Sequence, residues 1–440
     1  MDDFKVLNNS KMIGDMLSSI AEYVSTLFLE RLLHSESVEY YTRSLKGLEG
    51  GMGLYIHIPY CHKPLCAFCC FVRYPAEDRG EVRAYHRLLR REAELLASLA
   101  EGVRITTIYV GGGTPSIDVD ELAETIDWVR SVFGAKSASV SVEVHPRDVD
   151  EHLVEVLRGR VDRVSVGLQA LEAERLARMG RLNTSLERSI EAVEVLRGRF
   201  RTVNVDLVWG IPGDNAEIVG LEARRAFNLG VDQVTFYPVM PTPRTRNALK
   251  KGRASVWNPE EPRLYKIILE EAEAAGYKPC TPWCMCRGAR ELIDEYIVET
   301  PWFLALGVSG ISRIPGCVAA NTFSVKKYFR LVEGGGLSVE NATRVTCVEE
   351  ALYTMLSSLF GLEYLEGMLV KLHGPCAAPV ERLAKLLLRA LGESIEGGVW
   401  RVSRPGTLYT LHRLQHALYT ALAAFRYVKL SYASRPHPPR

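Results

Sequence analysis

The stretch Tyr55-Ile56-His57-Ile58-Pro59-Tyr60-Cys61-His62-Lys63-Pro64-Leu65-Cys66-Ala67-Phe68-Cys69-Cys70 holds four of the ten cysteines of the chain. A short apolar run, Leu54 to Ile58, leads directly into these cysteines. Proline at positions 59 and 64 prevents the run from continuing as regular structure. We therefore expect a strand that ends in a loop carrying three or four thiols.

Thiolates gathered this closely typically hold a soft metal, either zinc or an iron–sulfur cluster. Zinc sites usually have two separated cysteine pairs, or cysteine with histidine. Here Cys61, Cys66 and Cys69 stand as Cys-x4-Cys-x2-Cys, Cys70 follows directly, and no second CxxC lies nearby. Three thiolates on a four-iron cluster would leave one iron open for a small chelating ligand. The spacing favours a cluster; zinc, or redox and structural thiols, are the alternatives.

The composition of the 440-residue chain, 47% hydrophobic and 24% charged, predicts one large domain with one or two small ones. A net charge of +1 without a basic block gives no indication of nucleic-acid binding. We find no export signal and no apolar run of membrane-spanning length. Together with the ten cysteines, this predicts a protein of the reducing cytoplasm without a membrane span.

Between residues 53 and about 240, short β-rich runs alternate with helical patterns. The expected strands are Leu54–Ile58, Thr106–Val110, Ser139–Val144, Arg163–Leu168, Thr202–Val208 and Gln233–Tyr237. The expected helices include Val82–Leu99, Val119–Val132, Glu151–Leu157, Ser185–Leu196 and Ala216–Asn228. Strict alternation with nearly continuous apolar strands predicts an α/β fold whose parallel sheet is buried on both faces. Six such units can form an open doubly wound sheet or a barrel, complete or partial.

Polar or glycine-rich residues lie at or near the carboxyl end of each expected strand. They are the cysteine loop, Gly111-Gly112-Gly113-Thr114, Glu143 with His145, Gln169, Asp206 with Gly210-Ile211-Pro212-Gly213, and Tyr237-Pro238. In parallel α/β folds, the functional site is built from these carboxyl ends. Six strands that present such residues to one rim indicate a site there.

Each of these residues can be interpreted in two ways. The glycine run is interpreted either as a tight turn that needs positive φ, or as bare backbone that a ligand's amino or carboxylate group can approach closely. Glu143 and Asp206 lie in apolar strands, where an unpaired carboxylate is costly, so they pair with an arginine or bind ribose hydroxyls or an ammonium group. Gln169 and Arg181 are interpreted either as contacts to a carboxylate or sugar of a ligand, or as residues that serve only the structure.

The ends of the chain predict helices. Residues 1–50 carry an apolar stripe at helical spacing from Ile13 to Phe28, which predicts two helices packed on a larger body. Residues 345–430 are mainly helical, with a small hairpin at Gly397–Val402, and match a winged-helix domain in size. Residues 431–440 are proline-rich and predict a disordered tail. We expect domains at 1–50, 51–330 and 331–430.

A second group of thiols stands as Cys-x3-Cys-x-Cys at Cys280, Cys284 and Cys286. It is a second metal site, a catalytic thiol near the substrate, or three ordinary buried cysteines, since cysteine packs well in protein cores.

Several ordered motifs together resemble radical S-adenosylmethionine (SAM) enzymes, especially the group of oxygen-independent coproporphyrinogen III oxidase, the heme chaperones and the class C radical SAM methylases. These motifs are Tyr-Ile-His-Ile-Pro-Tyr-Cys from Tyr55, Gly-Gly-Gly-Thr-Pro-Ser from Gly111, Glu143, Val-Ser-Val-Gly-Leu-Gln up to Gln169, Gly180-Arg181, and Val-Asp-Leu-Val-Trp-Gly-Ile-Pro-Gly around Asp206. The resemblance covers residues 53 to 330 and extends more loosely to 430.

The resemblance implies a partial (β/α)6 barrel in which Cys61, Cys66 and Cys69 hold a 4Fe-4S cluster. The open iron would take the methionine amine and carboxylate of SAM. Gly112, Gly113 and Thr114 would contact that methionine portion, and Glu143, Gln169, Arg181 and Asp206 align with positions that contact SAM. Tyr55 matches a tyrosine near the cluster, which we take as the catalytic candidate. A low-potential electron from a reduced flavodoxin- or ferredoxin-type donor would give a 5′-deoxyadenosyl radical.

The chain departs from this group at several positions. The family spacing is Cys-x3-Cys-x2-Cys, so one residue is inserted here, and Cys70 is one position early for a frequent fourth cysteine. The family's Gly-Tyr-x-x-Tyr-Glu segment is replaced by Gly276-Tyr277-Lys278-Pro279-Cys280, and a usual histidine is Ile311. These later changes fall on the substrate side. Two functions remain: a radical SAM enzyme for decarboxylation or methylation of a tetrapyrrole or similar planar molecule, or a heme carrier whose ligands include His57, His62 or His145.

Overall fold

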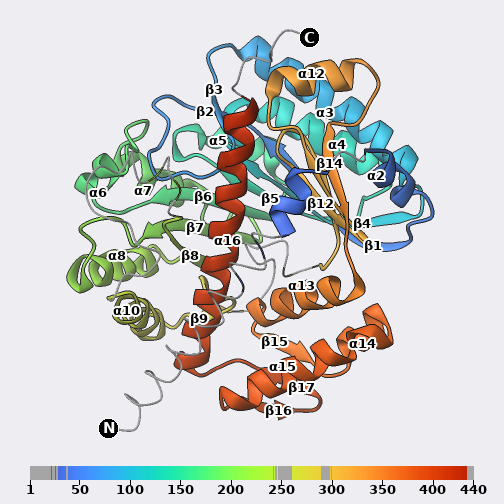
Figure 1. Ribbon diagram of the computed structural model, residues 1–440. Coiled ribbons are helices and arrows are strands. Elements are labelled where there is room, and N and C mark those ends of the chain that lie inside the picture. The colour runs from blue at the N-terminus through green and yellow to red at the C-terminus, as the bar shows by residue number, and fades with distance from the viewer. Residues whose placement is uncertain are drawn as a thin grey trace.

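The computed structural model describes residues 21, 25, 28–35, 38–240, 242, 245, 260–288, 298 and 300–433. Its centre is a twelve-stranded sheet with the order β14-β13-β12-β11-β1-β4-β5-β6-β7-β8-β10-β9 (Figure 1). The parallel strands are β1 (Gly50–Ile58), β4 (Val103–Gly112), β5 (Ser139–Val144), β6 (Arg163–Gln169), β7 (Thr202–Trp209), β8 (Gln233–Pro238) and β11 (Phe303–Leu306). All six strands expected from the sequence are present, and the predicted α/β class is confirmed.

Helices follow these strands in the predicted alternation. They are α3 (Arg79–Leu99), α4 (Val119–Val132), α5 (Glu151–Leu157), α6 (Ala173–Arg178), α7 (Leu186–Leu196), α8 (Ala216–Asn228) and α10 (Glu261–Ala274), with short 3-10 turns η1 (Pro115–Asp118) and η2 (Pro146–Asp148). Most begin at a side chain that caps the first turn: the carboxylates of Asp118 and Asp150 and the hydroxyl of Ser185 each accept a hydrogen bond from a backbone N–H three residues ahead.

Further strands extend the sheet at both edges. On one side, β12 (Ile311–Ile314), β13 (Cys317–Asn321) and β14 (Val339–Arg344) add antiparallel to β11, with α12 (Val325–Glu333) in between. On the other side, β10 (Cys284–Cys286) and β9 (Lys278–Pro279) add antiparallel to β8. The sequence indicated a strand and turn near Trp302–Ser312 but not β13 or β14, so the sheet reaches beyond the predicted domain boundary at residue 330.

A smaller unit follows the sheet. It consists of α13 (Cys347–Phe360), α14 (Met368–His373), the turn η3 (Pro375–Ala377), α15 (Ala378–Ala390) and the three-stranded sheet β15 (Glu363–Leu365), β17 (Val399–Arg401) and β16 (Ser394–Glu396). The pair β16–β17 is the hairpin predicted at Gly397–Val402. Three short helices with a small sheet agree with the predicted winged-helix-like character.

The long helix α16 (Pro405–Ala433) bridges the two edges of the large sheet; Figure 1 shows it in red, running across the sheet. Near one end, Arg413 donates a 2.6 Å hydrogen bond to Glu261 at the start of α10. Near the other end, the Lys429 ammonium donates to Glu340 of β14 at 2.9 Å. These anchors are 16 residues apart, which corresponds to about 24 Å of helix. The helix therefore closes the side of a sheet that does not close on itself.

The N-terminal part of the chain is only partly described. The helix α2 (Val38–Leu45) packs its Tyr41 side chain against the sheet, where the phenol donates to Ser312. Most of the predicted stripe from Ile13 to Phe28 lies outside the described residues, as does the predicted tail beyond Ala433. The domain boundaries stay a prediction. In the described part of the chain, no helix combines the length and hydropathy needed to cross a bilayer.

Candidate functional site

One cavity of about 770 Å³ lies at the carboxyl ends of the parallel strands. Every site residue predicted from the sequence lines it: Tyr55, Cys61, Cys66, Cys69, Gly112, Gly113, Thr114, Glu143, Gln169, Arg181 and Asp206. Cys70 also lines it. Residues that are up to 151 positions apart in the sequence therefore meet at one rim, as expected for a parallel α/β fold.

The cysteine loop is held at both ends by backbone pairing. The two-residue strands β2 (Tyr60–Cys61) and β3 (Tyr74–Pro75) pair in parallel at its base. Within the loop, Arg73 donates to the carbonyl oxygens of Cys66 and Cys69, and the Ala67 N–H donates to the Met179 carbonyl at 2.9 Å. These bonds fix the loop backbone without using the thiols.

The donor set of this loop fits an iron–sulfur cluster. Burial, together with the nearby Cys69 thiol, raises the pKa of the Cys61 thiol to about 12. A bound metal supplies positive charge that favours the thiolate, so the three neighbouring cysteines are suited to ligate one. Beside them, Nε of Arg73 and Nε of Arg181 are buried and have no hydrogen-bond partner among the described residues. These two donors would compensate the negative charge of thiolates and bridging sulfides.

The glycine segment is shaped by its protein neighbours. Gly112 has φ +113°, a conformation that side chains disfavour, and a Cβ there would lie 2.5 Å from the His57 ring. A Cβ on Gly113 would lie 2.5 Å from the Tyr60 carbonyl oxygen. The Gly112 N–H donates to Glu143 Oε2 at 3.1 Å, and the Tyr109 hydroxyl donates to Oε1 at 2.8 Å. The glycines are therefore needed for packing, and the Tyr109 hydroxyl and the Gly112 N–H fix Glu143 at the cavity wall.

Asp206 belongs to a chain of short hydrogen bonds on neighbouring strands. Its carboxylate accepts from the Ser165 hydroxyl and the Asn204 amide, both at 2.7 Å, and the Thr235 hydroxyl donates to Asn204 at 3.0 Å. The serine hydroxyl and the asparagine amide hold Asp206 at the cavity, and the threonine hydroxyl orients that amide.

Gln169 lies where β6 departs from regular geometry. Its φ is +73°, and the register between β6 and β7 shifts between Gly167 and Gln169. Non-glycine residues at positive φ are uncommon and occur often at binding sites. Arg181 reaches the same place, where its guanidinium donates to the Gly167 carbonyl at 2.5 Å and to the Cys66 sulfur at 3.5 Å. Arg181 thus connects the end of β6 with the cysteine loop.

Tyr55 lies between a histidine and a second tyrosine. Its hydroxyl donates to Nδ1 of His57 at 2.8 Å, and its ring stacks on Tyr109 with centroids 6.2 Å apart. The opposite nitrogen of His57 donates to the Val72 carbonyl at 2.9 Å. Burial lowers the pKa of His57 to about 4, so the ring is neutral and can accept from Tyr55. This chain of bonds orients the Tyr55 phenol at the wall of the cavity.

The other two histidines also serve the structure. Both ring nitrogens of His145 are used, since Nδ1 accepts from the Arg147 N–H and Nε2 lies 3.1 Å from the Asn183 amide oxygen. Burial lowers the pKa of His145 to about 2. His62 Nε2 lies 2.6 Å from the Asp148 carboxylate. His57 and His145 therefore use both ring nitrogens for hydrogen bonds within the protein, as expected for histidines with a structural role.

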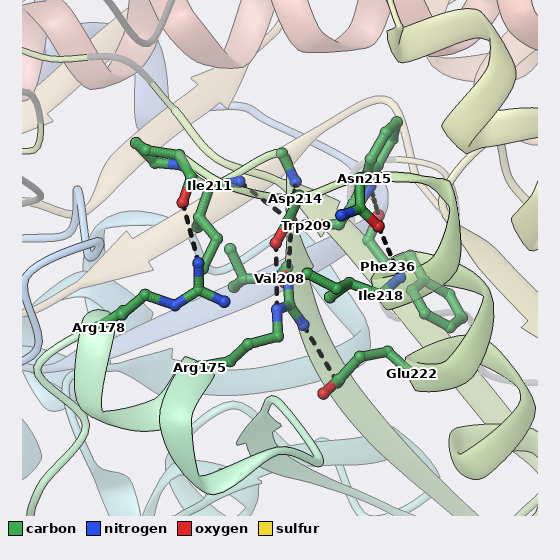
Figure 2. Close-up of polar contacts among 12 residues, drawn as sticks. Arg175, Arg178, Val208, Trp209, Ile211, Asp214, Asn215, Ile218, Glu222 and Phe236 are labelled. Atoms are coloured by element: carbon green, nitrogen blue, oxygen red, sulfur yellow. Dashed lines mark hydrogen bonds and ion pairs between the residues drawn. The ribbon is translucent and has the colours of Figure 1, made fainter. Parts of the chain in front are cut away.

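A buried ion network holds the end of β7 below the cavity (Figure 2). Arg175 of α6 makes two hydrogen bonds to the Asp214 carboxylate and an ion pair with Glu222 at 3.1 Å. Asp214 also accepts the backbone N–H groups of Gly210 and Ile211. All three charged side chains are almost completely buried. The Gly-Ile-Pro-Gly turn after Asp206 is thus fixed by charge-assisted hydrogen bonds.

The family model described as the radical SAM superfamily matches residues 55–221, which contain all ten predicted cluster and SAM residues, Tyr55 and every motif named above. The chain belongs to the radical SAM superfamily.

Relatives of this radical SAM protein fall into two groups. The chain is 31% identical over 242 residues to a protein of Mycobacterium tuberculosis named heme chaperone HemW, and it spans only 62% of that relative's length. It is 25% identical over 366 residues to the oxygen-independent coproporphyrinogen III oxidase of Paracoccus denitrificans, which covers 78% of this chain and 81% of the relative. In fold it is similar to the coproporphyrinogen III oxidase (HemN) of Escherichia coli, with a TM-score of 0.70 at 21% identity over 88% and 95% of the chains.

The cavity of this radical SAM protein continues from the cysteine loop into an apolar region. Its lining there comes mainly from α13 and α16 and includes Leu352, Tyr353, Leu356, Phe360, Leu418, Tyr419 and Leu422. This wall could not be predicted from a local sequence pattern, because both helices begin more than 270 residues after the cysteine loop. Tyr109, Ser165 and Asn204 were also missed. Their polar groups alternate with apolar neighbours in strands, which is equally typical of solvent-facing positions.

Two of the three cysteines of the second thiol group are paired with each other. Cys280 and Cys286 are joined in a disulfide, and only Cys284 remains a thiol in this group. All three are buried against one another, and none lines the cavity. A second metal site therefore lacks support. A further disulfide joins Cys347 and Cys376, a pairing that cannot be deduced from spacing.

Proposed function

We propose that this protein is an enzyme that uses a 4Fe-4S cluster and SAM to act on a tetrapyrrole or a similar planar substrate, by decarboxylation or class C methylation. The observation that carries the proposal is the meeting of the three cysteines and all predicted SAM residues at one cavity. The similarity to proteins named oxygen-independent coproporphyrinogen III oxidase supports this proposal.

In this proposal, Cys61, Cys66 and Cys69 hold the cluster, and Gly112, Gly113, Thr114, Glu143, Gln169, Arg181 and Asp206 bind SAM. When bound, these groups supply a 5′-deoxyadenosyl radical that abstracts hydrogen from the substrate. The chain's own residues position SAM and the substrate and shield the reacting atoms from water. Glu143 and Asp206 present carboxylates, oriented by the Tyr109 and Ser165 hydroxyls, that would bind an ammonium group or ribose hydroxyls. Tyr55, oriented by neutral His57, lies at the cavity wall as the catalytic candidate.

The apolar region formed by α13 and α16 is an argument for a planar substrate. Aromatic and leucine side chains there bury a flat ring system and exclude water from the reacting atoms. An electron would come from a reduced flavodoxin- or ferredoxin-type protein, and the proposal places this chain in the cytoplasm with such carriers.

The second candidate is a heme-carrying protein that keeps the cluster without turnover. The 31% identity to proteins named heme chaperone favours it. Against it, both ring nitrogens of His57 and His145 are already hydrogen-bonded, so neither can ligate heme iron without breaking those bonds. We therefore prefer the enzyme.

The test is an anaerobic assay. The protein is reconstituted with iron and sulfide, reduced with dithionite and supplied with SAM, and 5′-deoxyadenosine is quantified with and without coproporphyrinogen III. We expect its formation to be abolished in Cys66→Ser and retained in Cys70→Ser, because only Cys66 belongs to the proposed ligand set.

Heme titration separates the two candidates. One heme bound per chain, with no substrate-dependent consumption of SAM, would establish the carrier. Consumption of SAM that rises with coproporphyrinogen III and yields a product lighter by carbon dioxide, or heavier by a methyl group, would establish the enzyme and identify its reaction.

A further inference from the structure

Several arginines line the cavity, and most of them are engaged by the protein itself. Arg31 forms a 2.9 Å ion pair with Glu349. Arg73 and Arg181 donate to the carbonyls of the cysteine loop and of Gly167. Arg313 donates to the carbonyls of Pro301 and Glu350 and stacks on the Tyr353 ring. Each of these guanidinium groups therefore already has a hydrogen-bond or ion-pair partner within the protein.

Arg426 of α16 is different. It lines the cavity and is partly buried, and its guanidinium carbon lies 4.6 Å from the centre of the Phe71 ring, directly after the cysteine loop. Within the described ranges, no hydrogen bond or ion pair engages this guanidinium. A cation is thus present between the cysteine loop and the apolar region, and no carboxylate of the described residues forms an ion pair with it.

The position of Arg426 on the helix directs it toward the ligand space. Leu418, Leu422 and Arg426 follow one another at intervals of four residues, so they share one face of α16, and all three line the cavity. The next turn carries Lys429, whose ammonium is paired with Glu340. The chain therefore neutralises one cation of this face and leaves the other beside an aromatic ring, which orients a planar guanidinium.

We propose that Arg426 binds a carboxylate of the substrate and selects planar apolar ligands that carry one. This inference rests on the proposed function for the identity of the site. The planar fork of a guanidinium matches a carboxylate with two parallel hydrogen bonds, and such a bond is strong where water is partly excluded. The apolar wall binds the ring system, and Arg426 sets how the ring system is turned toward the cysteine loop.

The test compares a carboxylate with its neutral analogue. Binding of 1-pyrenebutyrate and of 1-pyrenebutanol to the reconstituted full-length protein is followed by pyrene fluorescence. We expect the wild type to bind the carboxylate about tenfold more tightly, the size expected for a charge-assisted pair. Arg426→Met keeps an apolar side chain on Phe71 and should abolish the preference by weakening only pyrenebutyrate. Arg426→Lys should keep part of it. Arg382→Met, on the exposed face of α15, is the control for loss of charge and should keep the full preference.

Each outcome is decisive. Equal affinity of the wild type for both probes, or an undiminished preference in Arg426→Met, overturns the proposal. If Arg426→Met instead weakens SAM binding while the preference persists, the anion at Arg426 belongs to the cofactor, and the proposal is also overturned. A second pair, coproporphyrin III and its tetramethyl ester, tests the substrate class separately. If neither porphyrin binds but the pyrene preference depends on Arg426, the tetrapyrrole proposal fails and the role of Arg426 stands.

Discussion

At the scale of single residues, the cavity wall relies on neutral donors to hold its carboxylates. Glu143 accepts from a phenol and a backbone N–H, and Asp206 accepts from a hydroxyl and an amide. These hydrogen bonds come from neutral groups and orient both carboxylates. The choice of donors therefore matters for a ligand that carries an ammonium group or several hydroxyls.

Glu143→Gln tests this arrangement. A glutamine offers one acceptor oxygen, so either the Tyr109 hydroxyl or the Gly112 N–H loses its partner, and the negative charge is lost. We expect the dissociation constant for SAM to rise about tenfold in equilibrium binding to the reconstituted protein, as expected for loss of a hydrogen bond to a charged group. Tyr109→Phe removes one hydrogen bond and keeps the charge, so its effect should be smaller. Unchanged affinity in Glu143→Gln would exclude a role in SAM binding.

At the scale of elements, α16 depends on buried charges. Glu261 accepts from Arg413 and from Nε2 of His412, and Trp283 donates to the other nitrogen of His412 at 2.9 Å. Burial opposes ionisation of Glu261, but the hydrogen bonds and charges of His412 and His416 hold its pKa well below the ordinary value. The carboxylate is therefore charged at neutral pH and is the counter-ion of Arg413.

Glu261→Gln should detach this anchor. It leaves the Arg413 guanidinium buried without a counter-ion, which typically costs about 3–5 kcal/mol. We expect a loss of that size in the free energy of unfolding from denaturant titration. Glu260→Gln changes the exposed neighbouring carboxylate and is the matched control, with an expected loss within about 0.5 kcal/mol. Equal stability of the two variants would show that the ion pair does not hold α16.

The Cys347–Cys376 disulfide joins the start of α13 to η3 across 29 residues. Closing a loop of this length restricts the unfolded chain and contributes about 3–4 kcal/mol in the chain-entropy model. We expect Cys347→Ser to lower the free energy of unfolding by that amount. A reductant should lower the stability of the wild type by a similar amount, because Cys376 is exposed. A larger effect of reductant on Cys347→Ser than on the wild type would contradict this assignment.

Elements that depend on local pattern could be predicted from the sequence, and contacts between distant segments could not. Strands β1 and β4 to β8 follow from apolar runs bounded by turn residues, and the site follows because parallel strands bring their carboxyl ends together. In contrast, β14 reads Val-Glu-Asn-Ala-Thr-Arg, which has little apolar character, and it is a strand only because β13 pairs with it. The approach of Arg426 to Phe71 joins residues 355 positions apart and leaves no local pattern.

At the scale of the whole molecule, buried neutral histidines make stability depend on pH. His86 of α3 is completely buried and bonds Thr125 of α4. Burial, with a smaller effect of Arg90, lowers the pKa of His86 to about 3 from an ordinary value of 6.5. Between these values the unfolded chain binds a proton that the folded chain does not. The contribution of neutral His86 to the free energy of unfolding is complete above pH 6.5 and is lost as the pH falls toward 3.

We expect this group to reduce the free energy of unfolding by about 1.4 kcal/mol for each pH unit below 6.5. His86→Gln, which keeps a polar contact to Thr125 but does not titrate, should show a correspondingly shallower decline between pH 6.5 and 4. His34→Gln, at an exposed position, should follow the wild type. Parallel pH curves for all three proteins would mean that His86 is protonated in the folded state.

The closure of the sheet by α16 has a consequence for biosynthesis. Every other described part of the cavity wall precedes α16 in the chain, so the sheet and the cysteine loop leave the ribosome first. Until α16 docks, the thiols face an open side, and an iron–sulfur donor can reach them without displacing folded structure. In the proposed enzyme, docking would then enclose the cluster behind the two ion-pair anchors at Arg413 and Lys429. The order of the elements along the chain thus sets the interval in which the cofactor is most easily inserted.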